Sequence, residues 1–191
     1  WLLRAGVPGW PLIPAPVRIV LGVLALWLAW LAVVQARILG INFLLSVLTL
    51  VWVADIFAYF AGRAFGLRFT RNKLAPSISP GKSWEGALGG AVGVMLMAVL
   101  WVQCDAQLQP DSLSLFSHLA QGGWALLVLA TLFLTAMSVL GDLVESLIKR
   151  SAGVKDSSQL LPGHGGVLDR IDALVPTLPL AMMLVSSVTV I

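Results

Sequence analysis

The chain has 191 residues, of which 59% are hydrophobic and 11% are charged, and its formal net charge is +3. A soluble domain carries about 25% charged residues, so the composition excludes an ordinary soluble protein and indicates an integral membrane protein. The single cysteine, Cys104, excludes an internal disulfide and a metal site built from cysteines.

Five stretches are long and apolar enough to cross roughly 30 Å of hydrocarbon. In chain order they are residues 17–35, 41–61, 86–102, 123–141 and 173–191. The third stretch is short and rich in glycine, which favours close packing against another helix. The sequence therefore predicts an all-α, polytopic membrane protein with about five transmembrane helices.

The charges between these stretches predict how the helices are oriented in the membrane. The segments 62–85 and 142–172 hold most of the Lys and Arg residues, whereas 103–122 holds none. Positively charged loops stay in the cytoplasm, so we expect the two basic segments to be cytoplasmic loops that form a polar site. The turn at 36–40, the segment 103–122 and the C-terminus are then expected outside.

A polar turn is expected before the third stretch, and one acidic residue, Asp55, lies inside the second. An acid within a membrane helix indicates a functional site unless it pairs with a basic residue. PGKS at 80–83 matches the end of a P-loop, but Pro76 occupies the place of its first glycine and no strand is expected before it. Ser79, Lys82 and Ser83 at a helix N-terminus are instead expected to bind a phosphate or nucleotide.

The segment 142–172 holds five of the nine acidic residues. If the fourth helix continues to residue 150, Asp142, Glu145 and Lys149 share one of its faces. An ordinary helix end that forms salt bridges at the membrane surface would explain the same pattern.

Glycines interrupt the middle of this segment and prevent a regular helix there. Gly165 and Gly166 allow the backbone to approach a ligand closely and to direct several N–H groups at one anion. A flexible turn is the alternative. His164 lies among these glycines, where a hydrogen-bonding role is more common than metal binding.

Asp169 and Asp172 follow, three residues apart on one face of a helix. Together with Asp142 they supply the hard oxygen donors that Mg²⁺ prefers. Lys155 and Arg170 are suited to bind phosphate beside them. Because Asp172 adjoins the last apolar stretch, it is expected to face a polar interior, a cation or a metal.

The run SLIKRSAGVKDSSQLLPGHGGVLDRID, residues 146–172, resembles the signature of the phosphatidate cytidylyltransferase family, also called CDP-diacylglycerol synthases. WVADIFAYFAGRAFG and SPGKSWEGALGG are similar to the central region of that family, and the resemblance covers about residues 50–190. Two small departures are Gly81, where Lys is common, and Ser83, where Thr is common. Because the chain begins at Trp1, we expect an N-terminally truncated piece with N-terminal transmembrane helices over 1–61 and the catalytic region over 62–191.

The resemblance implies that CTP and phosphatidate react to give CDP-diacylglycerol and pyrophosphate at a bacterial inner membrane. It implies Mg²⁺ held by Asp142, Asp169 and Asp172, with a second, monovalent cation left open, and phosphates bound by Lys149, Arg150, Lys155 and Arg170. The catalytic set would be these three aspartates with Lys149 and Arg150. The substrate-binding set would be Asp55, Ser79, Lys82, Ser83, Lys155, Asp156, His164, Gly165, Gly166 and Arg170. A lipid bilayer and a homodimer are expected as partners, and no nucleic acid.

The proposed chemistry explains why no catalytic dyad is evident. The attacking lipid phosphate is already anionic, so catalysis rests on positioning and charge stabilisation. A CTP-dependent lipid-alcohol kinase, with Asp156 as its base, and an ion-coupled transporter, with Asp55 and Asp172 as ion sites, remain alternatives. The paired-aspartate pattern of CDP-alcohol phosphotransferases is absent from the sequence.

Overall fold

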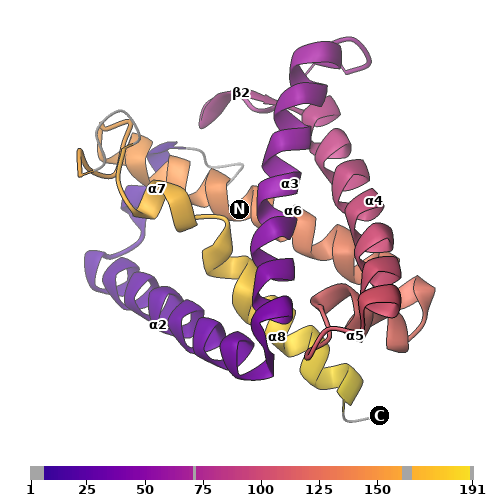
Figure 1. Cartoon of the computed structure of the whole chain (residues 1–191). Coiled ribbons are helices and arrows are strands. Elements are labelled where there is room, and N and C mark those ends of the chain that lie inside the picture. The colour runs from indigo at the N-terminus through magenta and orange to yellow at the C-terminus, as the bar shows by residue number, and fades with distance from the viewer. Residues whose placement is uncertain (1–6, 71, 161–164, 190–191) are drawn as a thin grey trace.

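The computed structural model describes residues 7–70, 72–160 and 165–189, which form a bundle of helices (Figure 1). The elements in chain order are η1 (Trp10–Leu12), α2 (Ala15–Leu39), α3 (Ile41–Phe65), β1 (Lys73–Ala75), β2 (Ser79–Ser83), α4 (Trp84–Leu108), α5 (Leu115–Gln121), α6 (Trp124–Ser151), α7 (Leu168–Ile171) and α8 (Leu174–Thr189). Within the described residues, five helical segments are long and apolar enough to cross a membrane, and the fifth joins α7 to α8. The predicted helical membrane fold is confirmed.

Helices α3 and α4 pack against each other through glycines of α4, as the glycine-rich third stretch predicts. A Cβ atom added at Gly90 would lie 2.8 Å from the carbonyl oxygen of Ala54, and one added at Gly93 would overlap the ring of Phe57. Small residues allow membrane helices to come this close, so the backbones themselves meet along this seam.

The main core lies where α3, α5, α6 and α8 meet, with Phe43, Leu50 and Phe116 among its fully buried side chains. Helix α2 runs obliquely beside α8 in Figure 1 and buries only Ala32 and Ala36. Most of its large apolar side chains are exposed, which is the arrangement expected of a helix that faces lipid.

The two basic loops lie at the same end of the bundle, as the charge pattern predicts. In Figure 1 the β-strands and α7 lie at one end, and α5 lies at the other. The segment 62–85 contains the strands, and 142–172 contains α7. The two segments, which are far apart in sequence, can therefore contribute to one polar surface.

Residues 79–83 differ from the polar turn that we expected, because they form strand β2. This strand pairs antiparallel with β1, with Lys73 opposite Ser83. The hairpin has tertiary support that local sequence does not reveal: Ile78, which is fully buried, packs with Leu143 and Leu147 of α6.

A buried polar network, which we call the far-end network, fixes α5 at the opposite end of the bundle. The Asp105 carboxylate accepts hydrogen bonds from Asn42 Nδ2 at 2.9 Å, from Ser117 Oγ at 2.5 Å and from the Ser114 backbone N–H at 3.1 Å. Trp101 Nε1 in turn donates to Asn42 Oδ1 at 3.0 Å. The network links α3, α4 and α5, so it secures the far end of the α3–α4 pair.

Candidate functional site

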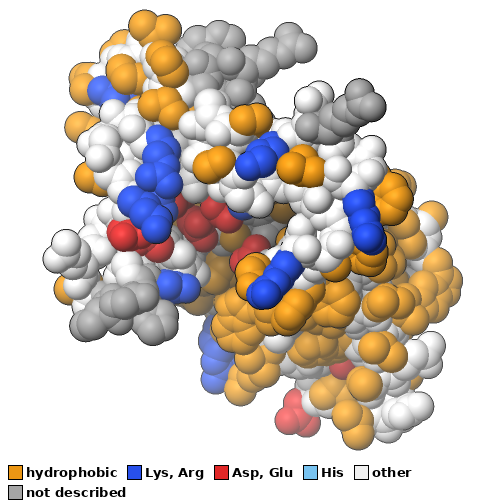
Figure 2. All heavy atoms as spheres, turned by 90° about the horizontal axis from the view of Figure 1, so that it is seen from above, with side chains coloured by type: hydrophobic (Ala, Val, Ile, Leu, Met, Phe, Trp, Pro, Cys, Tyr) orange, Lys and Arg blue, Asp and Glu red, His pale blue; other side chains and the backbone are white. Residues whose placement is uncertain are grey.

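A cavity of about 560 Å³ opens between α3, the hairpin, the start of α4 and α6. Its polar lining comes from three separate segments, with Asp55 and Arg63 on α3, Lys82 and Ser83 on β2, and Asp142 on α6. Seen from above, Lys and Arg side chains surround a hollow in which acidic side chains are visible (Figure 2). This arrangement of charge suits an anionic ligand that carries a metal ion.

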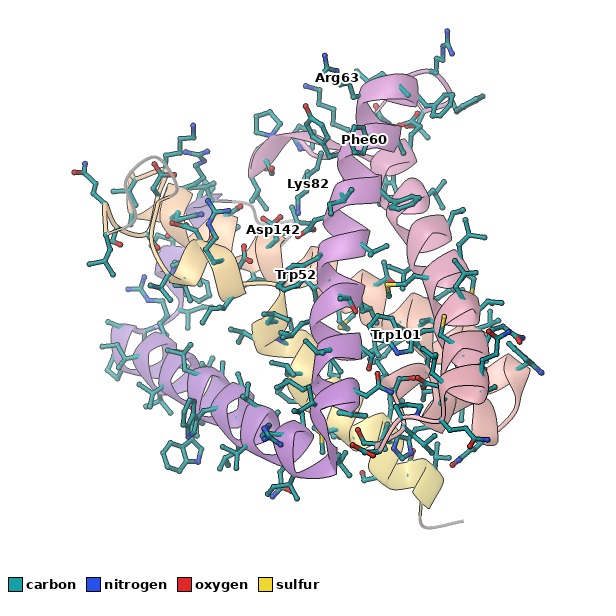
Figure 3. The ribbon with its side chains drawn as sticks, in the orientation of Figure 1. Trp52, Phe60, Arg63, Lys82, Trp101 and Asp142 are labelled. Carbon is teal, nitrogen blue, oxygen red and sulfur yellow. The ribbon has the colours of Figure 1, made fainter. Side chains whose placement is uncertain are left out.

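An ion pair spans the cavity between Lys82 and Asp142. The Lys82 Nζ atom lies 2.5 Å from Asp142 Oδ2, and Figure 3 shows the two side chains pointing toward each other. Asp172 lies close enough for its charge to interact with those of Asp55, Asp142 and Lys82. Among these four groups, three carboxylates face a single ammonium group.

The segments before and after Lys82 in the chain are both anchored, which holds Lys82 at the cavity. On one side, Ile78 anchors the hairpin to α6. On the other, Ser83 caps α4, because its Oγ accepts a hydrogen bond from the Gly86 N–H at 3.1 Å. Glu85 also fixes this corner, since its Oε1 accepts from the Thr70 N–H at 2.7 Å and from the Phe69 N–H at 3.1 Å.

A second polar cluster lies on α6, outside the lining of the cavity. Lys149 Nζ lies 2.5 Å from Glu145 Oε2 and 2.6 Å from Asp169 Oδ1. Glu145 and Lys149 are four residues apart, so the self-paired helix end considered from the sequence is present here. The additional contact to Asp169 ties this helix to α7.

The glycine-containing loop directs its N–H groups at Asp169. Asp169 Oδ2 accepts from the Gly166 N–H at 2.6 Å, from the Ser157 N–H at 3.0 Å and from Ser157 Oγ at 2.9 Å. Gly165 adopts a φ of +78°, which glycine tolerates without strain. These donors converge on the protein's own Asp169 carboxylate, so the binding of a ligand anion by Gly165 and Gly166 stays a prediction.

The structure divides the predicted site residues into groups. Asp55, Lys82, Ser83 and Asp142 line the cavity, with Asp172 nearby, whereas Lys149, Asp169, Gly165 and Gly166 belong to the second cluster. Four further predicted residues are exposed near these clusters: Arg150, Lys155, Asp156 and Arg170. Ser79 lies at the start of β2. His164 lies outside the described residues.

Comparison with known proteins gives the family. The model of the cytidylyltransferase family matches residues 13–188. The chain belongs to the cytidylyltransferase family. Phosphatidate cytidylyltransferases are similar to it: that of Haemophilus influenzae is 50% identical over 140 residues, which is 73% of this chain and 44% of the relative. That of Pseudomonas aeruginosa is 44% identical over 164 residues, 85% of this chain and 55% of the relative.

A phosphatidate cytidylyltransferase of Staphylococcus epidermidis is 40% identical over 150 residues, 78% of this chain and 51% of the relative. The chain spans about half the length of the curated relatives that it matches. These matches confirm the resemblance seen in the sequence. The cavity is lined by residues on both sides of residue 61, where we expected the N-terminal helices to end and the catalytic region to begin.

The acidic residues differ in how well they suit the metal implied by the family. No group of three or more His, Cys, Asp and Glu residues is placed for direct metal binding within the described parts of the chain. Asp142, with Asp55 and Asp172 nearby, supplies hard oxygen donors of the kind that a divalent cation takes. Asp142 and Asp169 are each paired with a lysine, so each would have to exchange that lysine for the metal. The metal roles of Asp142, Asp169 and Asp172 stay predictions.

Sequence reasoning left Tyr59, Arg63 and Glu145 out of the site. Tyr59 and Arg63 line the cavity, and Arg63 Nη1 donates to the Tyr59 hydroxyl at 3.1 Å. Their spacing offered a signal, because residues 55, 59 and 63 follow the i, i+4 pattern of one helix face. Glu145 carried the same signal through its position four residues before Lys149.

Proposed function

We propose that the chain forms the catalytic part of an enzyme that transfers a cytidylyl group from CTP to phosphatidate, giving CDP-diacylglycerol and pyrophosphate. The observation that carries the proposal is the cavity itself. Lys82 and Asp142 meet there, among helices apolar enough to span a membrane. Membership of the cytidylyltransferase family and the names of the similar proteins support the nucleotide and the lipid as substrates.

The reaction in this proposal is a direct displacement. An anionic phosphate oxygen of phosphatidate forms a bond to the α-phosphorus of CTP, and the bond from that phosphorus to pyrophosphate breaks. The electron pair of the broken bond leaves with pyrophosphate. No proton has to be removed from the nucleophile, so the cavity needs no general base.

The main barrier in this reaction is repulsion between two anionic substrates. Lys82 and Arg63, which both line the cavity, would bind phosphate oxygens and offset that repulsion. Asp142 and Asp172, with Asp55 beside them, would hold a magnesium ion. The chemistry that such an ion would supply there is the stabilisation of negative charge on the phosphates and on the leaving pyrophosphate.

The proposed setting is the bacterial inner membrane, with the cavity open to the cytoplasm. The basic residues at this end of the bundle support that orientation, because positively charged loops remain cytoplasmic. Basic groups beside the bilayer also attract anionic lipids such as phosphatidate. The homodimer stays a prediction from the family resemblance.

The experiment that tests the proposal uses the full-length protein in detergent with CTP labelled at the α-phosphate, phosphatidate and Mg²⁺. We expect label in the lipid extract, and a loss of about 100-fold or more in Asp142→Asn. Asp111→Asn, at an exposed position between α4 and α5, is the matched control and should keep its activity.

The position of the label in CTP separates this proposal from the kinase alternative. Transfer of the γ-phosphate, rather than the α-labelled nucleotide, into lipid would establish a CTP-dependent kinase instead. If a folded full-length protein gives no labelled lipid from either position, the cytidylyltransferase assignment is wrong.

A further inference from the structure

We propose that Lys82 is a built-in counter-cation, which neutralises Asp142 in the resting protein and leaves it when a metal–nucleotide complex binds. Lys82 would thereby make metal binding depend on the nucleotide. The inference rests on the proposed function for the identity of the metal and the nucleotide, and it assigns Lys82 a second role at the same cavity.

The first argument is direct competition for one carboxylate. Lys82 Nζ is in ion-pair contact with Asp142 Oδ2 at 2.5 Å, and Ser146 Oγ donates to the other oxygen, Asp142 Oδ1, at 3.2 Å. A magnesium ion binds carboxylate oxygens at about 2.0–2.1 Å and demands near-octahedral geometry. The Lys82 ammonium group therefore competes with a metal ion for Asp142 Oδ2 in the observed arrangement.

The second argument is the balance of charge around this ion pair. Asp55 lines the same cavity, and Asp172 lies within electrostatic range of Asp55, Asp142 and Lys82. Like charges gathered in a partly desolvated site repel one another more strongly than in water. Lys82 and Arg63 offset part of this repulsion, and of the two it is Lys82 that is paired with Asp142. Removing the charge of Lys82 should therefore make the pocket more acidic and raise its affinity for a free divalent cation.

The third argument is that Lys82 can move without the fold changing. Its backbone is held by strand pairing and by the Ser83 cap, but its side chain is partly exposed in an open cavity. A lysine has a flexible four-carbon stem, so its ammonium group can pass from a carboxylate to a nearby phosphate. A bound triphosphate offers that new partner.

The second lysine of the site shows the contrasting arrangement. Lys149 is held by two carboxylates, Glu145 and Asp169, and it lies outside the lining of the cavity. Releasing Lys149 would leave both carboxylates without their shared cation. Among the described residues, releasing Lys82 breaks only one ion pair. Lys82 is therefore better suited than Lys149 to exchange its partner during binding.

The consequence is a coupling between the two ligands. A metal ion that binds alone must displace the Lys82 ammonium group from Asp142 and leave that ammonium group without an anionic partner. A metal ion that binds with CTP brings phosphate oxygens, which can pair with the Lys82 ammonium group instead. Coupling between two ligands is reciprocal, so the nucleotide should tighten metal binding by the same factor as the metal tightens nucleotide binding.

The test is binding of Mn²⁺ to the full-length protein in detergent, followed by electron paramagnetic resonance without phosphatidate. Without nucleotide, Lys82→Met should bind Mn²⁺ at least about fivefold more tightly than wild type, within the usual range of such couplings. Adding CTP should tighten Mn²⁺ binding strongly in wild type and much less in Lys82→Met.

Matched variants define which site the signal reports. Lys73→Met removes the same charge from an exposed position on the neighbouring strand, and it should bind Mn²⁺ as wild type does. Lys82→Arg keeps the charge and should retain the weak binding of metal alone, which covers the case in which Lys82→Met does not fold. Asp142→Asn should abolish the gain in the Lys82→Met background.

If folded Lys82→Met, or a folded Lys82→Gln in its place, binds Mn²⁺ no more tightly than wild type without nucleotide, the proposal is overturned. Equal tightening by CTP in wild type and variant would overturn it as well. Because neither measurement involves turnover or lipid, the result is independent of whether the product of the reaction is CDP-diacylglycerol.

Discussion

The backbone around Asp169 leaves no room for a side chain at Gly166. A Cβ atom there would overlap Ser157 Oγ and would lie 2.7 Å from Ser158 Oγ and 2.9 Å from the Ser158 nitrogen. The absence of a side chain allows the Gly166 N–H to reach the Asp169 carboxylate at 2.6 Å. The glycine is therefore a requirement of the loop that wraps around Asp169.

At this residue we predict that Gly166→Ala displaces the loop. The proposed cytidylyl transfer should then fall by about tenfold or more, because small misplacements in a site cost that much. Limited proteolysis should show faster cleavage within 152–160. Gly22→Ala is the control, because an added Cβ at Gly22 contacts nothing within 4 Å. Unchanged activity and proteolysis in Gly166→Ala would show that the loop is dispensable.

A second prediction at the scale of residues concerns the thermal stability that Asp105 provides in the far-end network. Asp105→Ala leaves Asn42, Ser114 and Ser117 without the carboxylate that accepts their hydrogen bonds. A buried polar group left unpaired costs about 1–3 kcal/mol, so the melting temperature in detergent should fall. The control is Asp111→Ala, which is exposed and should melt as wild type does.

Because the far-end network is remote from the cavity, activity at low temperature should be largely retained in Asp105→Ala. A loss of transfer activity without any loss of thermal stability would contradict a purely structural role for Asp105.

The helices were the most predictable elements, because a bilayer demands long apolar segments whose backbone groups are satisfied internally. Each of the five expected spans has a helix, and the structure extends the fourth to Ser151. The hairpin was not predictable in the same way. Its stability comes from Ile78 packing on α6, a contact between residues far apart in sequence.

The site was predictable in its residue types and less so in their pairing. Spacing correctly placed Glu145 and Lys149 on one helix face. Helical spacing carries no information on contacts between elements, so it could not show that Lys82 faces Asp142 or that Lys149 reaches Asp169. Those pairings depend on how the hairpin and α7 pack against α6.

At the scale of elements, the seam between α3 and α4 gives a prediction of stability. Gly93→Val would drive a branched side chain into the ring of Phe57. Overpacking typically costs about 1–3 kcal/mol, so thermal unfolding in detergent should begin at a lower temperature. Gly22→Val is the control, since its position on α2 is open; an equal effect in both variants would mean that helix propensity, not packing, is responsible.

For the whole molecule, the two ends of the bundle should lie on opposite sides of the membrane. In a Cys104→Ser background, a cysteine at Asp111 should react with an impermeant maleimide added to intact spheroplasts. A cysteine at Gln159 should react only after lysis, because the basic loops are proposed to be cytoplasmic. Labelling of both positions in intact spheroplasts would contradict the proposed orientation.

The closed seam between α3 and α4 also constrains the route by which the proposed lipid substrate would reach the cavity. Contacts join these two helices from Gly62 and Gly86 at the cavity end to Asn42 and Asp105 at the other end. Acyl chains cannot pass between backbones that already touch. A substrate that diffuses sideways out of the bilayer is therefore expected to approach the cavity from another flank of α3, where Trp52 and Phe60 are exposed.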